Sequence, residues 1–300
     1  MNTEQKVKNL NTGLENNDPR ALRQIYDIYN AEILPMFRAD YSGKISSDKP
    51  VYLFNTGQPG AGKTAVAPNI IMREFPNRPY ARIDADALRE FCPWYKDICA
   101  EQLPLAALTN LAAMIWQNLL VLYCLEHNVE LAMQDGTYKD TQFIADVVNG
   151  ELARARKLYN GLGMEYPIKQ KPAHKFQMWV IDTHPEISRL YAQIRAFKTF
   201  EEIGFCRAPE DAYLAGSLNG MYKTLTYASN EKVLDRIVIF NRDGEFKFDT
   251  NKDPNLDFGA ALKTLHSRPL ASEEQDFIEL WRNNSEFNKF LKFQNLTFTY

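Results

Sequence analysis

The sequence has little cysteine and little histidine, with four residues of each among 300. The cysteines form no Cys-x-x-Cys pair, and the histidines are scattered without the spacing of metal ligands. This pattern argues against a zinc site and against a disulfide framework, and a chain of this length needs neither to bury a core. We therefore expect a reduced chain in the cytoplasm.

The sequence also lacks a large excess of charge of either sign. Its 35 Lys and Arg residues and 38 Asp and Glu residues give a formal net charge of -3. Together with 45% hydrophobic residues, this balance excludes a disordered or collagen-like chain and a protein that coats nucleic acid. No nucleic acid is expected among its partners.

No segment resembles a secretory signal, because residues 1–17 are polar and contain no apolar stretch. The longest apolar segment, residues 111–125, is shorter than the roughly 20 residues that a bilayer requires. Gln117 and Asn118 also interrupt it. We therefore expect a buried core helix there, and no membrane partner.

What the sequence does contain is an alternation of strand-like and helix-like segments. Strands are expected near residues 51–54, 80–84, 129–133, 176–181 and 236–240, and helices near residues 63–75, 104–127, 140–159, 186–200 and 209–227. This order predicts an α/β fold with a mainly parallel sheet flanked by helices. The turn at residues 241–244 and the alternating residues 245–248 predict that the sheet ends in a hairpin.

The two ends of the chain are expected to be helical extensions. Asp18 and Pro19 form a helix start, with an Asp cap before a Pro at the first helical position. Two further helices are expected at residues 257–266 and 272–291. We thus predict an N-terminal extension over residues 1–48, a core over 49–250 and a C-terminal extension over 251–300.

The strongest motif is a Gly-x-x-x-x-Gly-Lys-Thr loop between the first predicted strand and the helix that follows it. Its residues, all predicted to bind the nucleotide, are Gly57, Gln58, Pro59, Gly60, Ala61, Gly62, Lys63 and Thr64. The backbone N–H groups of such a loop point at phosphates, the lysine reaches the β and γ oxygens, and the threonine hydroxyl can hold Mg²⁺. The motif predicts ATP and Mg²⁺ as cofactors, with Thr64 as the metal-binding residue.

Carboxylates follow three of the predicted strands, at Asp84 and Asp86, at Asp135 and at Asp182. The carboxyl ends of parallel strands face the ligand crevice, so all three groups are candidates for the site. For Asp182 we favour a plain helix cap. Asp84 and Asp86 are two residues apart, which lets one stay with the core while the other projects into the cleft. Asp86 is then placed to accept the proton of an acceptor hydroxyl, as the base of a kinase does.

Cations for the phosphoryl group are expected from Arg195 and Arg207, which flank a break containing glycine. That arrangement suits a helical lid, near residues 195–227, that closes over ATP. An arginine on a helix is more often solvated or paired at the surface, and spacing alone does not decide between these readings.

Taken together, these motifs resemble the zeta toxin family, the P-loop kinases of bacterial toxin and antitoxin systems that phosphorylate UDP-N-acetylglucosamine. GQPGAGKT is similar to the family's GQPGSGKT, RIDADALR to its IDxDxF, and DGTYK at residues 135–139 to its EGTGR. Cys206–Ala208 resembles its lid region, and residues 237–244 resemble its closing strand and turn. The resemblance extends over about residues 48 to 250.

The resemblance implies that Lys63 and Thr64 serve ATP and Mg²⁺, that Asp86 is the base and that Arg195 and Arg207 clamp phosphates. It also implies that the substrate-binding residues are Asp84, Asp135, Thr137 and Lys139. Asp135 stands where the family has Glu, Tyr138 where it has Gly, and Lys139 where it has Arg. Because lysine lacks the two-pronged donor geometry of arginine, the predicted substrate is a nucleotide-sugar or another nucleotide, such as NAD.

Two alternatives remain at this point. The chain could be an NTPase or nucleotide-gated switch in which Asp135 or Asp182 holds Mg²⁺ and no second substrate is phosphorylated. It could instead be an interaction protein whose helices at residues 18–40 and 272–291 dock an antitoxin or a host partner. Some zeta-like proteins are injected effectors, and this chain is also a candidate for that role.

Overall fold

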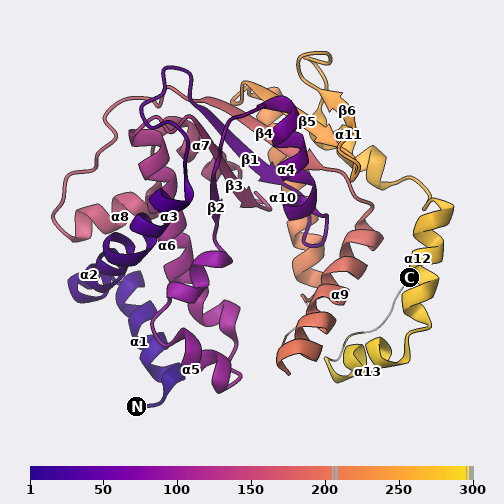
Figure 1. Cartoon of the computed structure of the whole chain (residues 1–300), viewed down its shortest axis with the longest axis horizontal. Helices are drawn as coiled ribbons and strands as arrows, with labels where there is room; N and C mark the ends of the chain where they lie inside the picture. Colours follow the sequence, from indigo (N-terminus) through magenta and orange to yellow (C-terminus); the bar gives the residue numbers. More distant parts are fainter. Residues whose placement is uncertain (205, 207–208, 295, 297–300) are drawn as a thin grey trace. The chain divides into compact units, whose positions relative to one another are not determined.

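The computed structural model describes residues 1–204, 206, 209–294 and 296 (Figure 1). The strands are β1 (Val51–Thr56), β2 (Ala81–Asp84), β3 (Leu131–Gly136), β4 (Lys175–Ile181), β5 (Arg236–Phe240) and β6 (Phe246–Asp249). They form a six-stranded sheet in the order β2-β3-β1-β4-β5-β6. β2 pairs with β3 in parallel, β4 pairs with β5 in parallel, and β6 closes on β5 in an antiparallel hairpin. The predicted α/β class and the predicted hairpin are confirmed.

Helices lie before, between and after these strands in the sequence. They are α1 (Thr3–Glu15), α2 (Pro19–Ile28), η1 (Tyr29–Ile33), α3 (Leu34–Asp40), α4 (Lys63–Glu74), η2 (Ala87–Phe91), α5 (Tyr95–Ala100), α6 (Leu105–Glu126), α7 (Thr141–Asn149), α8 (Ala153–Gly161), α9 (Pro185–Ile203), α10 (Asp211–Asn230), α11 (Phe258–His266), α12 (Ser272–Arg282) and α13 (Ser285–Phe293).

The chain forms two compact units. The first consists of Met1–Phe54, Asn77–Asp135 and Gln142–Phe176. The second consists of Asn55–Pro76, Gly136–Thr141 and the described residues from Gln177 onward. The predicted boundaries at residues 48 and 250 stay a prediction.

The first unit is built around α6. Trp116 is fully buried and its indole N–H donates to the carbonyl of Ile25, at 2.8 Å, while the hydroxyl of Tyr29 donates to the carbonyl of Leu119. These bonds fasten the N-terminal helices to α6. A π-helical turn, η1, precedes Pro35, whose missing N–H and bulky ring disturb the helical ladder at that point.

α6 is the only helix in the described ranges with the length and hydropathy of a membrane span. Of its most apolar window, 67% is buried within the structure. This agrees with the prediction of a core helix over residues 111–125.

The second unit has an aromatic core between α9, α12 and α13, which lie together in Figure 1. The ring of Phe197 contacts the rings of Trp281, Phe287 and Phe290 at centroid distances of 6.3, 5.6 and 5.6 Å. Aromatic pairs at this separation add to the free energy gained by burial. The core therefore ties the C-terminal helices to α9.

Two predicted helices are each broken in two. The predicted helix at 140–159 stops at Asn149, because Gly150 turns into the left-handed region with φ 73°. The predicted helix at 272–291 restarts at Ser285, because the side chain of Asn284 accepts a hydrogen bond from the N–H of Phe287, at 2.9 Å. In both cases a local capping residue overrides the apolar periodicity.

Candidate active site

The phosphate loop lies in the second unit between β1 and α4. Gly60 and Gly62 have φ values of +84° and +94°, which only glycine adopts readily. A Cβ atom on Gly60 would stand 2.0 Å from the carbonyl oxygen of Ser188 in α9. The loop is thus packed directly on the backbone of α9, and position 60 has room for nothing larger than glycine.

Lys63 is folded back over the loop. Its Nζ donates to the carbonyl oxygens of Gly57 and Gln58, at 2.7 and 3.1 Å. Thr64 is exposed in the first turn of α4. A helix N-terminus with a lysine above it attracts anions through its free N–H groups and its dipole. The loop has the arrangement that the motif predicts for binding phosphates.

The segment after β4 is hydrogen-bonded to this loop. The hydroxyl of Thr183 donates to the carbonyl of Ala61, at 2.9 Å, and the side-chain amide of Gln58 donates to the carbonyl of Thr183, at 3.4 Å. Both side chains are buried. The loop is therefore held before any nucleotide arrives.

The fit of Mg²⁺ rests on Thr64. Mg²⁺ usually takes one or two protein oxygens and completes its shell with phosphate oxygens and water. Thr64 is an exposed residue, and its hydroxyl would be such an oxygen. Within the part of the chain that the structure describes, no group of three Asp, Glu, His or Cys residues is arranged to hold a metal. A magnesium ion at Thr64 would thus depend on the nucleotide's phosphates.

Asp182 is not a helix cap, and that prediction is wrong. The cap of α9 is His184, whose Nδ1 accepts from the N–H of Glu186 at 3.3 Å. Asp182 instead lies 3.1 Å from Nε2 of the buried His266 in α11, and His266 is hydrogen-bonded through Nδ1 to the hydroxyl of Tyr222, at 2.7 Å. Burial, together with the charge of Asp182, raises the pKa of Tyr222 to about 12. A partner 84 residues away thus determines the role of Asp182.

Two of the predicted substrate-binding residues meet in the first unit. Asp84 and Asp135 are register partners at the ends of β2 and β3. Arg82 bridges them, with Nη2 at 3.1 Å from Asp84 and at 2.7 Å from Asp135. Burial raises the pKa of Asp84, and the neighbouring charge of Asp135 acts in the same direction. The guanidinium compensates two carboxylates that would otherwise repel each other.

Asp86, the predicted base, stands at the surface of the first unit with 76% of its side chain exposed. Arg89 contacts its carboxylate at 3.0 Å. The same guanidinium donates to the carbonyl of Ala106 and the hydroxyl of Thr109 in α6, at 3.2 and 3.1 Å. Arg89 thus fixes the position of an otherwise solvated carboxylate.

Thr137 and Lys139 lie on the segment that follows β3. Lys139 packs so closely on α10 that a Cβ on Gly220 would stand 2.3 Å from the lysine Cβ, and its ammonium lies 5.5 Å from the ring centre of Tyr213. Tyr138 has a positive φ of 42°. The motif that residues 135–139 resemble has glycine at this position, and glycine adopts a positive φ more easily than tyrosine does.

The two predicted phosphate clamps have different outcomes. Arg195 is exposed on α9, which ends at Gly204 with φ 71°. The predicted glycine break is therefore present. Arg207 lies outside the described residues. Sequence reasoning missed a further arginine, Arg242, which lies against Gly62 of the loop.

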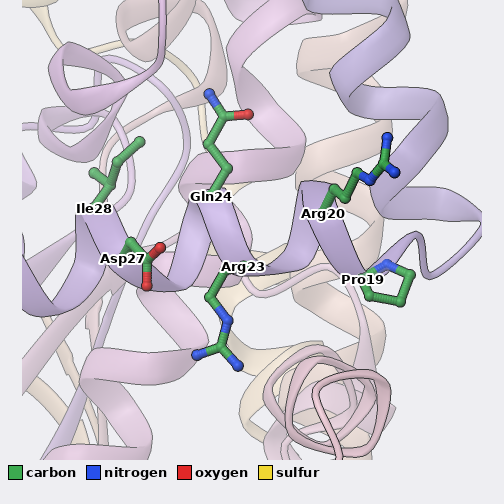
Figure 2. A pocket seen from close by; sticks show the side chains of 6 residues that line it. All are labelled: Pro19, Arg20, Arg23, Gln24, Asp27 and Ile28. Atoms are coloured by element: carbon green, nitrogen blue, oxygen red, sulfur yellow. The ribbon is translucent and has the colours of Figure 1, made fainter.

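An open hollow on α2 of the first unit is shown in Figure 2. It is lined by Pro19, Arg20, Arg23, Gln24, Asp27 and Ile28. It contains none of the residues predicted for the active site.

The comparison with protein families matches residues 38–156 to the zeta toxin model. Over these residues the chain is similar to the zeta toxin family. It includes the phosphate loop, the Asp84–Asp86 segment and residues 135–139, so the resemblance noted in the sequence is confirmed there. Arg195, Arg207 and the turn at 241–244 lie beyond the matched residues.

Two solved structures are similar to this chain. One belongs to the PezAT chromosomal toxin-antitoxin system of the human pathogen Streptococcus pneumoniae, with 20% identity and a TM-score of 0.68, over 89% of this chain and 97% of that one. The other is the YGR205w protein, with 12% identity and a TM-score of 0.33, over 76% and 96%. The first likeness shows the fold of this chain, and the second carries no argument. No curated protein sequence matches the chain.

Proposed function

We propose that the chain is an ATP- and Mg²⁺-dependent phosphotransferase of the zeta toxin type. Its acceptor is a hydroxyl of a nucleotide-sugar similar to UDP-N-acetylglucosamine, or of another nucleotide. The observation that carries the proposal is the phosphate loop. Thr183 donates a hydrogen bond to the carbonyl of Ala61 in this loop, and Lys63 folds over it. The loop lies within the residues that match the zeta toxin model.

The loop residues bind the triphosphate through their N–H groups. Lys63 exchanges its bonds to the carbonyls of Gly57 and Gln58 for the β and γ oxygens. Mg²⁺, when bound at Thr64, neutralises phosphate charge. We assign phosphate clamping to Arg195 and to Arg207.

Asp86 acts as the base in this proposal. The acceptor hydroxyl oxygen forms a bond to the γ-phosphorus, its proton passes to the Asp86 carboxylate, and the bond between the γ-phosphorus and the bridging oxygen breaks to release ADP. The contact with Arg89 supports this role, because a base must be held in one orientation to be in line. The exposure of Asp86 leaves it accessible to a substrate.

We assign recognition of the acceptor to Asp84, Asp135, Thr137 and Lys139. The carboxylates accept hydrogen bonds from sugar hydroxyls, and Lys139 offers a point charge to a diphosphate. Asp135 is one methylene shorter than the family's Glu. We therefore propose that the acceptor differs in shape from the family's usual substrate.

The experiment is a panel of nucleotide-sugars and dinucleotides incubated with the purified chain and Mg-ATP, with products followed by mass spectrometry. We expect one acceptor to gain 80 mass units, the mass of one phosphoryl group, in proportion to the ADP formed. Asp86→Asn should lower the rate by about 100-fold or more while ADP affinity stays within a few-fold. Normal ATP binding with every candidate unmodified would sink the proposal, and equal loss of binding and transfer in the variant would reassign Asp86.

The alternative of an NTPase without a second substrate finds less support in the geometry. Asp135 faces Arg82 and Asp182 faces His266, so each carboxylate proposed to hold Mg²⁺ already has a cationic or protonatable partner. Phosphate release without an acceptor, abolished by Asp135→Ala but not by Asp86→Asn, would favour this alternative.

We also propose that the chain is cytoplasmic and that it binds a protein partner there. The similar solved chain comes from a toxin-antitoxin system, and the hollow on α2 presents the exposed Arg20 and Arg23. An acidic antitoxin-like surface matches this charge. The test is co-expression with the protein encoded beside this chain's gene, followed by size-exclusion chromatography. Co-elution that the double variant Arg20→Glu, Arg23→Glu abolishes supports the proposal, and separate elution contradicts it.

A further inference from the structure

The turn after β5 places an arginine against the phosphate loop. The Nε and Nη2 atoms of Arg242 lie 3.5 and 3.7 Å from the point that a Cβ on Gly62 would occupy. Gly62 is the residue immediately before α4, where the loop turns into the helix. A guanidinium thus stands beside the part of the loop whose N–H groups bind phosphate.

Stacking fixes the orientation of this guanidinium. The central carbon of Arg242 lies 4.0 Å from the centre of the Tyr191 ring. Tyr191 in turn stacks on Phe277 of α12, with centroids 4.8 Å apart and planes at 24°. The three side chains come from the turn, from α9 and from α12. The stack therefore holds the guanidinium plane in one direction.

The turn itself is held by Asn241. Its side-chain oxygen accepts from the N–H groups of Asp243 and Glu245, at 3.1 and 2.8 Å, and its amide donates to the carboxylate of Glu245, at 2.9 Å. Glu245 also faces Lys247, at 3.5 Å. In the described ranges of the chain, no carboxylate forms an ion pair with Arg242. The turn thus presents an oriented cation that has no carboxylate within ion-pair distance in the described residues.

A cation stacked on an aromatic ring and lacking a carboxylate gains most from an anion that arrives with the ligand. We propose that Arg242 binds the phosphates of the nucleotide in the loop and that Tyr191 is its positioning residue. The inference rests on the nucleotide binding contained in the proposed function. It adds a cation from outside the segment 38–156 and independent of the lid arginines.

The test is calorimetric titration with two probes, Mg-ADP and inorganic tripolyphosphate. Arg242→Met removes the charge and keeps the aliphatic stem, and we expect its Kd to rise about 10- to 100-fold for both probes. Arg242→Lys keeps the charge without the planar stack, and Tyr191→Leu removes the platform, so both should show smaller rises. The matched control is Arg73→Met. Arg73 also lies over a ring, that of Phe246 at 4.6 Å, but it pairs with Glu74, so its loss should leave both Kd values within about two-fold.

Wild-type affinity of Arg242→Met for both probes would overturn the inference, as would a loss confined to Mg-ADP, which would indicate contact with the base. If Arg242→Met does not fold, as seen by circular dichroism, Arg242→Lys and Tyr191→Leu decide the matter by the same criteria. Wild type that binds Mg-ADP but transfers no phosphoryl group would contradict the proposed function and leave this inference standing. Wild type that binds neither probe contradicts both.

Discussion

The phosphate loop of the second unit and the three carboxylates of the first unit, Asp84, Asp86 and Asp135, are held in place by different kinds of contact. Backbone geometry holds the loop: two glycines with positive φ, a carbonyl of α9 and the N-terminus of α4. Side-chain cations hold the carboxylates, with Arg82 between Asp84 and Asp135 and Arg89 on Asp86. A site made of backbone is specified by a short motif. A site made of side chains depends on partners that the fold supplies.

The largest effect on stability and on ADP binding is expected at Gly60, where the backbone of α9 leaves no room for a side chain. Gly60→Ala must both strain a φ of +84° and move the carbonyl of Ser188. We expect a loss of more than about 2 kcal/mol in the free energy of unfolding and the loss of measurable ADP binding. Denaturant unfolding and ADP titration are the measurements.

Two glycines serve as controls for that variant. Gly163 has φ +68° but open space around it, so Gly163→Ala should cost only about 1 kcal/mol. Gly216 lies in α10 with neither constraint, and Gly216→Ala should stabilise by up to about 1 kcal/mol. Equal effects at all three positions would show that the contact with α9 is unimportant.

At the carboxylates of the first unit, we expect stability to depend on the charge of Arg82. Arg82→Met leaves Asp84 and Asp135 facing each other, and we expect the free energy of unfolding to fall by about 1 kcal/mol. The loss should be larger at pH 8 than at pH 5, because Asp84, whose pKa is already raised, takes up a proton as the pH falls and the repulsion is then removed. Urea unfolding at both pH values measures this. A loss independent of pH would point to packing rather than repulsion.

The first unit should also be sensitive to acid through His174. Burial lowers the pKa of this side chain to about 4, below the ordinary value of 6.5. The unfolded chain therefore takes up a proton at a pH where the folded chain does not. The stability is fully present above pH 6.5 and falls by about 2 kcal/mol as the pH decreases to 5.

His174→Phe tests that prediction and keeps the ring contacts with Tyr52 and Phe176. The change in stability between pH 7 and pH 5 should shrink by the amount given above, as measured by urea unfolding. A variant with the same pH dependence as the wild type would place the proton uptake elsewhere.

The smallest effect, on ADP affinity, is expected at the contact between Asp182 and His266. Asp182→Asn keeps the shape and the ability to contact His266, so ADP affinity should change by less than about three-fold. A large loss would mean that Asp182 faces the metal or the phosphates. Titration with Mg-ADP distinguishes the two.

The contrast between the two regions explains which features of the fold and of the candidate site the sequence predicts. The loop, the strands and the hairpin follow from local patterns, and each was predicted. The partners of the carboxylates were not, although Arg82 and Asp84 are two residues apart on β2 and share a face, which is a usable signal. Arg89 is three residues from Asp86, which is a second local signal. Arg242 gave none, because its contact with α9 depends on how distant segments pack.

Where prediction failed, a capping choice or a distant partner was responsible. Gly150 ended one helix and Asn284 started a new one, where periodicity alone would continue a single helix. Asp182 was interpreted as a cap because it precedes a helix start, yet His184 occupies that position and His266 binds Asp182. These choices lie within about 1 kcal/mol of each other, so a single sequence does not separate them.

The contact between Gly60 and Ser188 bears on how this chain can change over time. The atom that limits position 60 is a main-chain carbonyl, which every residue at position 188 would provide. This contact therefore limits the residue at position 60 but does not limit the choice of side chain at position 188. A phosphate loop built in this way keeps its shape as the sequence around it diverges, provided that the path of the helix behind it is retained.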